Sequence, residues 1–342
     1  MTKQPIMRVL SGDPVWPPPI WLMRQAGRYL PEYRAIREGG DFIARCTTPD
    51  LATEITLQPI RRYGMDAAIL FSDILILPWA LGQDLRFAEG EGPIMAPIRD
   101  AAGLGRLDLA RGQDKTAPVM QTVRQVRAAL PAECALLGFA GSPFTVACYM
   151  VEGGGSRDFA TTRTLAYSEP AFFRLLVDQL VEATIAYLAA QLTAGADAVM
   201  LFDTWAGILP PAQFREHVLR PTATIVAALR AQFPGVRIIG FPRLAGIFAA
   251  DYVAETGVDC IGLDTSVDAA SVAATLPART PVQGNLDPMV LIAGGNPLAT
   301  AARDICEGLR GRPHIFNLGH GILPHTPTAH VADLIAAIRE AA

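Results

Sequence analysis

The 342-residue sequence is poor in lysine. Apart from Lys3 and Lys115, every basic residue is an arginine, and neither lysine ends an apolar run that could form a strand. Enzymes that form Schiff bases, including those that use pyridoxal phosphate, need a lysine amine at the site. The sequence therefore argues against both mechanisms and favours chemistry without that cofactor.

Cysteine is also scarce, and no CxxC pair occurs. Scattered cysteines in odd number are typical of a protein in a reducing compartment, and they argue against a disulfide scaffold or a thiolate metal site. No GxGxxG opens a helix, and no GK[ST] follows residues 153–155, so this glycine run is interpreted as a mobile turn rather than a phosphate loop. The cysteines are Cys46, Cys134, Cys148, Cys260 and Cys306.

Long hydrophobic runs and excess positive charge are missing as well. Residues 1–16 contain no apolar segment with a cleavage site, and the longest apolar stretch, residues 136–151, is interrupted by Gly141 and Pro143. We therefore expect a cytoplasmic protein with no signal peptide and no membrane span. The net charge of −4 argues against nucleic acid as a partner, because phosphate neutralisation requires a basic field.

Short apolar runs alternate with longer amphipathic stretches along the whole chain. Eight strands that alternate with helices indicate the α/β class and predict a (β/α)8 barrel, one domain spanning residues 1–342. A doubly wound sheet is the alternative, but it lacks the glycine fingerprint. Residues 87–111 are expected to be an irregular excursion. The expected strands are Ile20–Gln25, Ala67–Asp73, Ala135–Gly141, Ala198–Thr204, Arg237–Pro242, Cys260–Thr265, Pro281–Asn285 and His314–Gly319.

Polar residues stand at the carboxyl ends of most of these runs. In a barrel those ends converge on one rim, where the active sites of this fold lie, so an active-site cleft is expected there. Loops also favour polar residues, and only the set as a whole argues for a site. The residues are Arg24, Asp73, Ser142, Asp203, Thr204, Arg243, Asp264, Asn285 and His320.

Arginines cluster after the first apolar run. Gly27 and Pro31 interrupt any helix there, which favours a binding loop over a solvated helix face. Arginine forks bind carboxylates bidentately, so the expected ligand is polyanionic. The cluster comprises Arg24, Arg28, Arg34 and Arg37.

Two further residues are candidates for chemistry. Asp73 ends a strongly apolar run; its ordinary role would be a cap, but beside arginine it would stay ionised and could accept N–H bonds or stabilise positive charge. His320 stands between Gly319 and Gly321, which would let its ring approach a ligand closely, although a structural histidine is the ordinary explanation.

Together these stretches resemble the uroporphyrinogen decarboxylase family, in an order that runs nearly end to end. A lone pair of arginines would mean little, whereas the ordered set is specific. The matching segments are residues 24–32 (RQAGRYLPE), 71–75 (FSDIL), 138–145 (GFAGSPFT), 149–156 (YMVEGGGS), 202–207 (FDTWAG), 283–288 (QGNLDP) and 317–321 (NLGHG).

The resemblance implies a distorted (β/α)8 barrel, a homodimer whose clefts face each other, and conversion of uroporphyrinogen III to coproporphyrinogen III and carbon dioxide without cofactor or metal. It assigns catalytic roles to Asp73, Arg37 and Tyr149. The proton donor stays open, because guanidinium groups are poor acids and water or a substrate carboxyl could serve. The implied substrate-binding residues are Arg24, Gln25, Ala26, Gly27, Arg28, Arg37, Asp73, Tyr149, Thr204 and His320.

Three positions depart from the family pattern: Arg243 stands where many members have lysine, Thr265 where tryptophan is common, and Thr204 where others have serine.

Two other functions are alternatives to the decarboxylase. Cobalamin-dependent methyltransferases that activate a thiol with zinc need a His/Cys cluster, and no His-x-Cys occurs. A tetrapyrrole carrier without catalysis would suit the arginines, but Asp73 and Tyr149 argue for chemistry.

Overall fold

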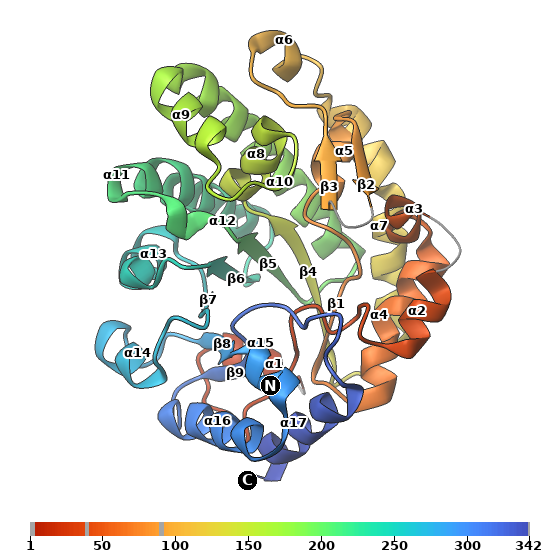
Figure 1. The fold of residues 1–342 in the computed structure, drawn as a ribbon, viewed down its shortest axis with the longest axis vertical. Coiled ribbons are helices and arrows are strands. Elements are labelled where there is room, and N and C mark those ends of the chain that lie inside the picture. The colour runs from red at the N-terminus through yellow and green to blue at the C-terminus, as the bar shows by residue number, and fades with distance from the viewer. Residues whose placement is uncertain (1–3, 38–40, 89–91, 341–342) are drawn as a thin grey trace.

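The computed structural model describes residues 4–37, 41–88 and 92–340. Its centre is a curled sheet of seven parallel strands in the order β1-β4-β5-β6-β7-β8-β9, and helices surround the sheet on the outside (Figure 1). The strands are β1 (Ala67–Ile69), β4 (Ala135–Gly141), β5 (Ala198–Asp203), β6 (Arg237–Pro242), β7 (Cys260–Gly262), β8 (Val282–Leu286) and β9 (His314–Leu318).

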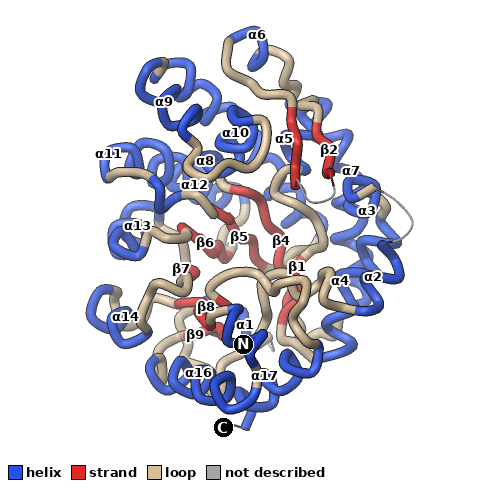
Figure 2. The backbone as a smooth tube through the Cα atoms, viewed as in Figure 1, coloured by secondary structure: helices blue, strands red, loops and turns tan. Residues whose placement is uncertain are grey.

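The helices connect successive strands and cover the outer face of the sheet, as Figure 2 shows for the whole chain. This alternation confirms the α/β barrel class expected from the sequence. The α-helices are α1 (Pro5–Leu10), α2 (Pro31–Arg37), α3 (Phe42–Thr47), α4 (Pro49–Tyr63), α5 (Ile76–Leu81), α6 (Ala101–Leu104), α7 (Leu109–Ala129), α8 (Pro143–Glu152), α9 (Ala160–Ser168), α10 (Pro170–Ala194), α11 (Pro211–Phe214), α12 (Arg220–Gln232), α13 (Ala249–Thr256), α14 (Ala269–Thr275), α15 (Pro288–Ala293), α16 (Gly295–Gly308) and α17 (Thr328–Glu340).

The prediction that residues 20–25 form the first strand is wrong. Only Ile20 forms an isolated parallel bridge, to Phe316 of β9. The Phe316 N–H donates to Pro19 O at 2.9 Å, and on the other side the Asp66 N–H donates to Ile20 O at 2.9 Å. This short segment therefore lies between β9 and the start of β1, where an eighth strand would stand.

Side chains replace the missing strand ladder. The Met23 N–H donates to Asn317 Oδ1 at 2.8 Å, and the Leu22 N–H donates to Gln25 Oε1 at 3.0 Å. The prolines at 17–19 carry no N–H, so the chain enters this segment without donors for a ladder. The chain turns after Met23, where the Gln25 N–H donates to Leu22 O at 2.9 Å, and Arg24 and Arg28 lie on irregular backbone as expected. For Arg34 and Arg37 the expectation of a loop is wrong, because Pro31 begins helix α2, which contains both residues.

The expected excursion at residues 87–111 contains more structure than predicted. An antiparallel hairpin, β2 (Leu85–Ala88) with β3 (Gly92–Met95), is followed by the short helix α6. Two of the glycines at residues 153–155, where a mobile turn was expected, have defined positions in the fold. Gly153 caps α8 with φ of 87°, and Gly154 pairs with Ile94 of the hairpin.

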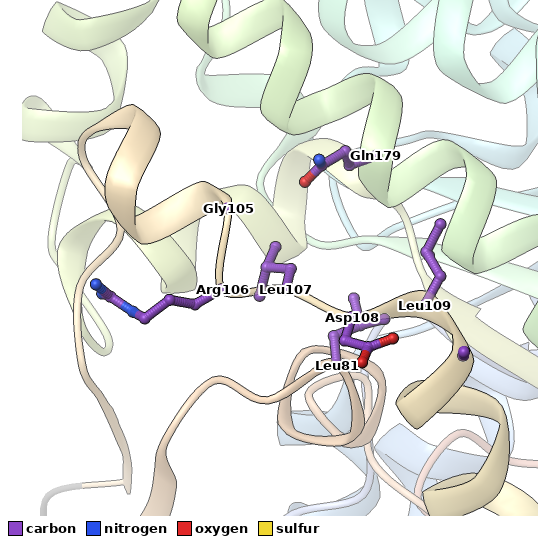
Figure 3. A pocket seen from close by; sticks show the side chains of 8 residues that line it. Leu81, Gly105, Arg106, Leu107, Asp108, Leu109 and Gln179 are labelled. Atoms are coloured by element: carbon purple, nitrogen blue, oxygen red, sulfur yellow. The ribbon is translucent and has the colours of Figure 1, made fainter.

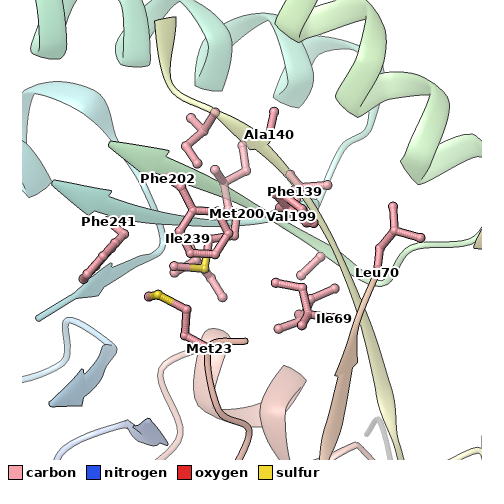
Figure 4. Packing of buried hydrophobic residues seen from close by; sticks show 14 of the residues in the cluster. Met23, Ile69, Leu70, Phe139, Ala140, Val199, Met200, Phe202, Ile239 and Phe241 are labelled. Carbon is pink, nitrogen blue, oxygen red and sulfur yellow. The ribbon is translucent and has the colours of Figure 1, made fainter. Parts of the chain in front are cut away.

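Buried side chains fill the interior of the barrel. The backbone of β4, β5, β8 and β9 is buried throughout, as expected for parallel strands covered on both faces. Figure 4 shows side chains of several strands packing together inside the curled sheet. Those labelled include Met23, Ile69, Phe139, Met200, Phe202, Ile239 and Phe241.

Helix α10 is the one described helix that is long and apolar enough to cross a membrane, judged by length and composition alone. Half of its most apolar window is buried within the protein, and it packs against α7, α8 and α12. Buried core helices of soluble proteins pass the same test, so this signal is weak. The stretch at residues 136–151, named from the sequence as the longest apolar run, folds as β4 and most of α8.

Candidate functional site

Asp73 lies in the turn between β1 and α5. Its Oδ1 accepts the Leu75 N–H at 2.8 Å, and its backbone oxygen accepts the Ile76 N–H at 3.2 Å. Burial raises the pKa of the Asp73 carboxyl, while the Leu75 N–H and the Arg24 charge oppose that shift. The cap occupies only one carboxylate oxygen, so Oδ2 is available for a ligand.

Arg24 is held in an unusual backbone conformation close to Asp73. Its φ is 62°, in the left-handed region that residues with a side chain rarely adopt. Such strain is commonly stored at functional sites, and here it aims an exposed side chain. Gly321 makes room for that side chain, because a Cβ there would lie 2.3 Å from Arg24 Cδ.

Tyr149 stands on α8, half-buried beside Trp205. Their ring centroids are 6.4 Å apart and tilted. Burial raises the pKa of the Tyr149 phenol and the nearby Asp73 charge adds to the increase, whereas Trp205 and the Arg24 charge lower it. Tyr149 therefore remains a protonated hydrogen-bond donor within electrostatic reach of both Asp73 and Arg24.

A buried polar pair fixes Trp205. The Thr145 hydroxyl donates to Asp203 Oδ1 at 2.5 Å and accepts the Trp205 N–H at 3.0 Å. Burial raises the pKa of Asp203 to about 7. Sequence reasoning named Asp203 as a strand-end residue but missed Thr145 and Trp205, although all three fall in motifs that carry the resemblance.

His320 follows β9, within electrostatic reach of two arginines. Burial, together with the charges of Arg24 and Arg243, lowers the pKa of the imidazole to about 4, while Asp264 opposes the shift. The ring is therefore neutral at ordinary pH. Its Nδ1 is buried and has no hydrogen-bond partner in the described part of the chain.

The other predicted site residues differ in how far they are exposed to solvent. Gln25 is fully buried, and its side chain donates to Ala67 O at 3.0 Å, so only its backbone is available to a ligand. Arg28 is exposed, while Ala26, Gly27 and Thr204 are half-buried. The Arg37 side chain lies outside the described part. Electrostatic coupling thus links Arg24, Asp73, Tyr149 and His320.

Two pockets of the structure lie away from these residues. Figure 3 shows one between the end of α5, the α6–α7 connection and α10. It is lined by Leu81, Gly105, Arg106, Leu107, Asp108, Leu109, Ala110 and Gln179. A second pocket is lined by residues around Trp16 and Arg310. Neither includes a predicted site residue, so a cleft at the strand ends stays a prediction.

The glycines beside His320 allow a paired test of site and scaffold. A Cβ at Gly319 would lie 2.4 Å from the Thr265 backbone nitrogen, which cannot move easily, whereas the three atoms nearest to a Cβ at Gly321 all belong to the flexible Arg24 side chain. We expect Gly319→Ala to lower the free energy of unfolding by about 1–3 kcal/mol. We expect Gly321→Ala to stay folded and raise KM by displacing Arg24.

Urea unfolding and steady-state kinetics of both variants measure the two effects. Equal stability losses in the two variants would contradict the assignment of Gly321 to the site.

Within the described residues, no three His, Cys, Asp or Glu side chains are grouped so that they could hold a metal ion. A methyltransferase from Methanosarcina mazei has the same fold, with a TM-score of 0.79 over 99% of both chains, but only 20% of its residues are identical. A match at this identity establishes the fold alone.

The sequence relatives are much more similar. The family model for uroporphyrinogen decarboxylase matches residues 1–341. A uroporphyrinogen decarboxylase from Gluconacetobacter diazotrophicus is 60% identical, with 99% of each chain covered. Another from Acidiphilium cryptum is 61% identical, covering 98% of this chain and 94% of the relative. These matches confirm the resemblance and the carboxy-lyase activity it implied: the chain belongs to the uroporphyrinogen decarboxylase family.

Proposed function

We propose that this decarboxylase removes carbon dioxide from each of the four acetate side chains of uroporphyrinogen III, giving coproporphyrinogen III, without a cofactor or metal. The observation that carries the proposal is the turn after β1, where the Asp73 carboxylate has one oxygen capped by the Leu75 N–H, together with the charge of Arg24, which acts on Asp73, Tyr149 and His320. One central anion with cationic and neutral donors around it suits a ring of pyrrole N–H groups that bears carboxylates.

Decarboxylation of an acetate needs an electron sink, which cofactors usually supply. Here the substrate would supply its own. Protonation of a pyrrole α-carbon makes that ring cationic. The C–C bond electrons of the adjacent acetate then flow into the ring as carbon dioxide leaves, giving a neutral exocyclic methylene. Protonation of the methylene and loss of the α-proton restore the pyrrole with a methyl group, so one proton is consumed overall.

The side chains divide this work by charge. Asp73 would accept the pyrrole N–H groups through Oδ2 and stabilise the ring cation. Arg24, Arg28 and Arg37 would hold substrate carboxylates as bidentate partners. Tyr149, kept protonated by burial, would donate a hydrogen bond.

The cleft would be completed by residues with smaller roles: the backbone of Gln25, Ala26 and Gly27, the Thr204 hydroxyl and the neutral His320 ring. Arg28 and Arg37 occupy the family positions for a proton donor. Because guanidinium groups are poor acids, water or a substrate carboxyl is an equal candidate for that donor.

A homodimer with facing clefts forms part of the proposal. Three large apolar side chains are exposed on the segments that follow β6 and β8: Leu244 at 45%, Ile247 at 89% and Met289 at 60%. Exposed apolar residues gathered at one end of a barrel favour a contact there between two copies. Sedimentation velocity measures the mass: a dimer supports this arrangement and a monomer contradicts it.

We further propose that the enzyme works in the cytoplasm. All five cysteines are free and buried, as is usual in a reducing compartment. Burial raises the pKa of Cys134 and Cys306 to about 12, so neither thiol ionises at neutral pH. Fractionation of cells of the source strain tests the location, and recovery of the activity with membranes would contradict it.

The deciding experiment is anaerobic incubation of the purified, chelator-treated protein with uroporphyrinogen III. The products are oxidised to porphyrins and separated by carboxylate number. Species with seven, six, five and then four carboxylates, formed without added metal or cofactor, are expected. Binding without loss of carboxylates would indicate a carrier instead, and absence of binding would mean that the role of the arginine loop is wrong.

A further inference from the structure

We propose that Arg243 binds a carboxylate of the tetrapyrrole, and that this carboxylate belongs to a propionate side chain, which the substrate keeps through all four decarboxylations. The inference rests on the proposed function, because it adds a contact for the same substrate near His320. Nothing in the family resemblance assigned Arg243 to the site.

The backbone of Arg243 is held firmly after the end of β6. Its N–H donates to Asp203 O at 3.1 Å, and its carbonyl accepts the Gly207 N–H at 3.0 Å. The segment after β6 is thus joined to the segment after β5, which carries Thr204 and Trp205. The side chain therefore starts from a fixed point between two strand ends, as a binding residue requires.

The guanidinium of Arg243 has no acceptor. No hydrogen bond or ion pair of this side chain occurs within the described part of the chain, although the side chain is half-buried. Other described arginines without a partner, such as Arg24, Arg28 and Arg303, are exposed and solvated. Because partial burial of an unpaired charge costs free energy, a half-buried arginine without an acceptor suggests an anionic ligand.

Backbone contacts bring the segments that carry Arg243 and His320 together. Asp264 accepts the N–H of Leu244, the residue after Arg243. Gly319, the residue before His320, packs against the same segment, because a Cβ there would lie 2.4 Å from Thr265 N and 2.9 Å from the carbonyl carbon of Asp264. In agreement with this arrangement, the charges of Arg24 and Arg243 both lower the pKa of His320. The buried Nδ1 of the neutral ring also lacks a partner. A carboxylate here could accept bonds from the Arg243 fork and, in the tautomer that carries its proton on Nδ1, from His320.

Asp264, the acid that acts on the His320 pKa, already has hydrogen-bond donors at both carboxylate oxygens. Asp264 Oδ2 accepts the Leu244 N–H, and Oδ1 accepts the Ser266 N–H at 2.8 Å and the Ser266 hydroxyl at 2.6 Å. The Asp264 oxygens thus serve the segments after β6 and β7, and within the described residues Asp264 forms no ion pair with Arg243. The positive charge of Arg243 is therefore left to a ligand.

A propionate is favoured over an acetate for a chemical reason. An acetate carboxylate leaves as neutral carbon dioxide, so an arginine paired with the reacting group would stabilise the ground state more than the transition state. A propionate keeps its charge from substrate to product, so an arginine bound to it can position the ring without opposing the reaction. Coproporphyrinogen III retains the propionates and has lost the acetates, which makes it a specific probe.

The experiment compares Arg243→Gln, Arg243→Lys and the wild-type enzyme, with Arg303→Gln on α16 as a matched control for loss of an exposed arginine. Arg243→Gln is expected to raise KM for uroporphyrinogen III about tenfold or more, as for loss of a hydrogen bond to a charged group, with little change in kcat. The Kd of coproporphyrinogen III, measured anaerobically by tryptophan fluorescence, should rise by the same factor. Arg243→Lys should fall between, because it keeps the charge and loses the fork.

Unchanged KM and unchanged product Kd in Arg243→Gln would overturn the proposal. A raised KM with an unchanged product Kd would overturn the propionate assignment, since it would mean that Arg243 holds an acetate. The product-binding measurement needs no turnover, so failure of the wild-type enzyme to decarboxylate would count against the proposed function alone.

Discussion

Asp73→Asn should lower kcat for uroporphyrinogen III by about a thousandfold. A carboxylate about 4 Å from a cation contributes about 4 kcal/mol at an effective dielectric of about 20. Because each 1.4 kcal/mol of barrier is about tenfold in rate, loss of this charge should produce that effect in the chemical step. A single-turnover measurement of carbon dioxide release, with saturating substrate, separates the rate of the chemical step from that of product release.

Asp73→Asn should change the charge at this position and leave the local structure intact. Asparagine retains an Oδ1 that can accept the Leu75 N–H, so the turn before α5 should be preserved. Asp287→Asn is the matched control, because exposed Asp287 caps α15 with the same bond, from Oδ1 to the Met289 N–H at 2.9 Å. Its kcat should not change. An Asp73→Asn enzyme that keeps most of its turnover number would exclude the electrostatic role.

Seven of the eight expected strands were predictable, because buried parallel strands are short apolar runs between turn signals. Residues 20–25 contain an equally apolar run, yet only Ile20 forms a bridge. The difference is made by Asn317 and Gln25, whose side chains take the N–H groups of Met23 and Leu22. A partner nearly three hundred residues away cannot be recognised from local periodicity.

The site was predictable where residues stand at strand ends, and less so where their roles depend on partners. Arg24 and Arg243 both stand at the carboxyl ends of apolar runs, and the sequence alone does not show that Arg24 is exposed whereas Arg243 is half-buried. The supporting contact between Thr145 and Asp203 joins the first turn of α8 to the end of β5. Such contacts depend on the barrel closing and not on spacing along the chain.

Trp21→Ala should lower the free energy of unfolding by about 3–5 kcal/mol. Trp21 is fully buried, and its Nε1–H donates to Gln283 Oε1 of β8 at 2.8 Å. Gln283 Nε2 in turn lies 3.8 Å from Met200 Sδ of β5, which is not a sheet neighbour of β8. Trp21 therefore joins the segment that replaces the eighth strand to side chains crossing the barrel interior. Urea unfolding, with an unchanged m value, measures the loss.

Separating packing from hydrogen bonding requires two further variants. Trp21→Phe keeps much of the ring but leaves buried Gln283 Oε1 without its donor, which should cost about 1–3 kcal/mol. Adding Gln283→Met to Trp21→Phe removes both polar partners and should recover most of that loss. Because Trp21 lies three residues before Arg24, Trp21→Ala should also raise KM for uroporphyrinogen III under conditions in which the variant is still folded. If Trp21→Ala were as stable as the wild-type protein, the segment at residues 19–25 would be held by its backbone contacts to β9 and Asp66 alone.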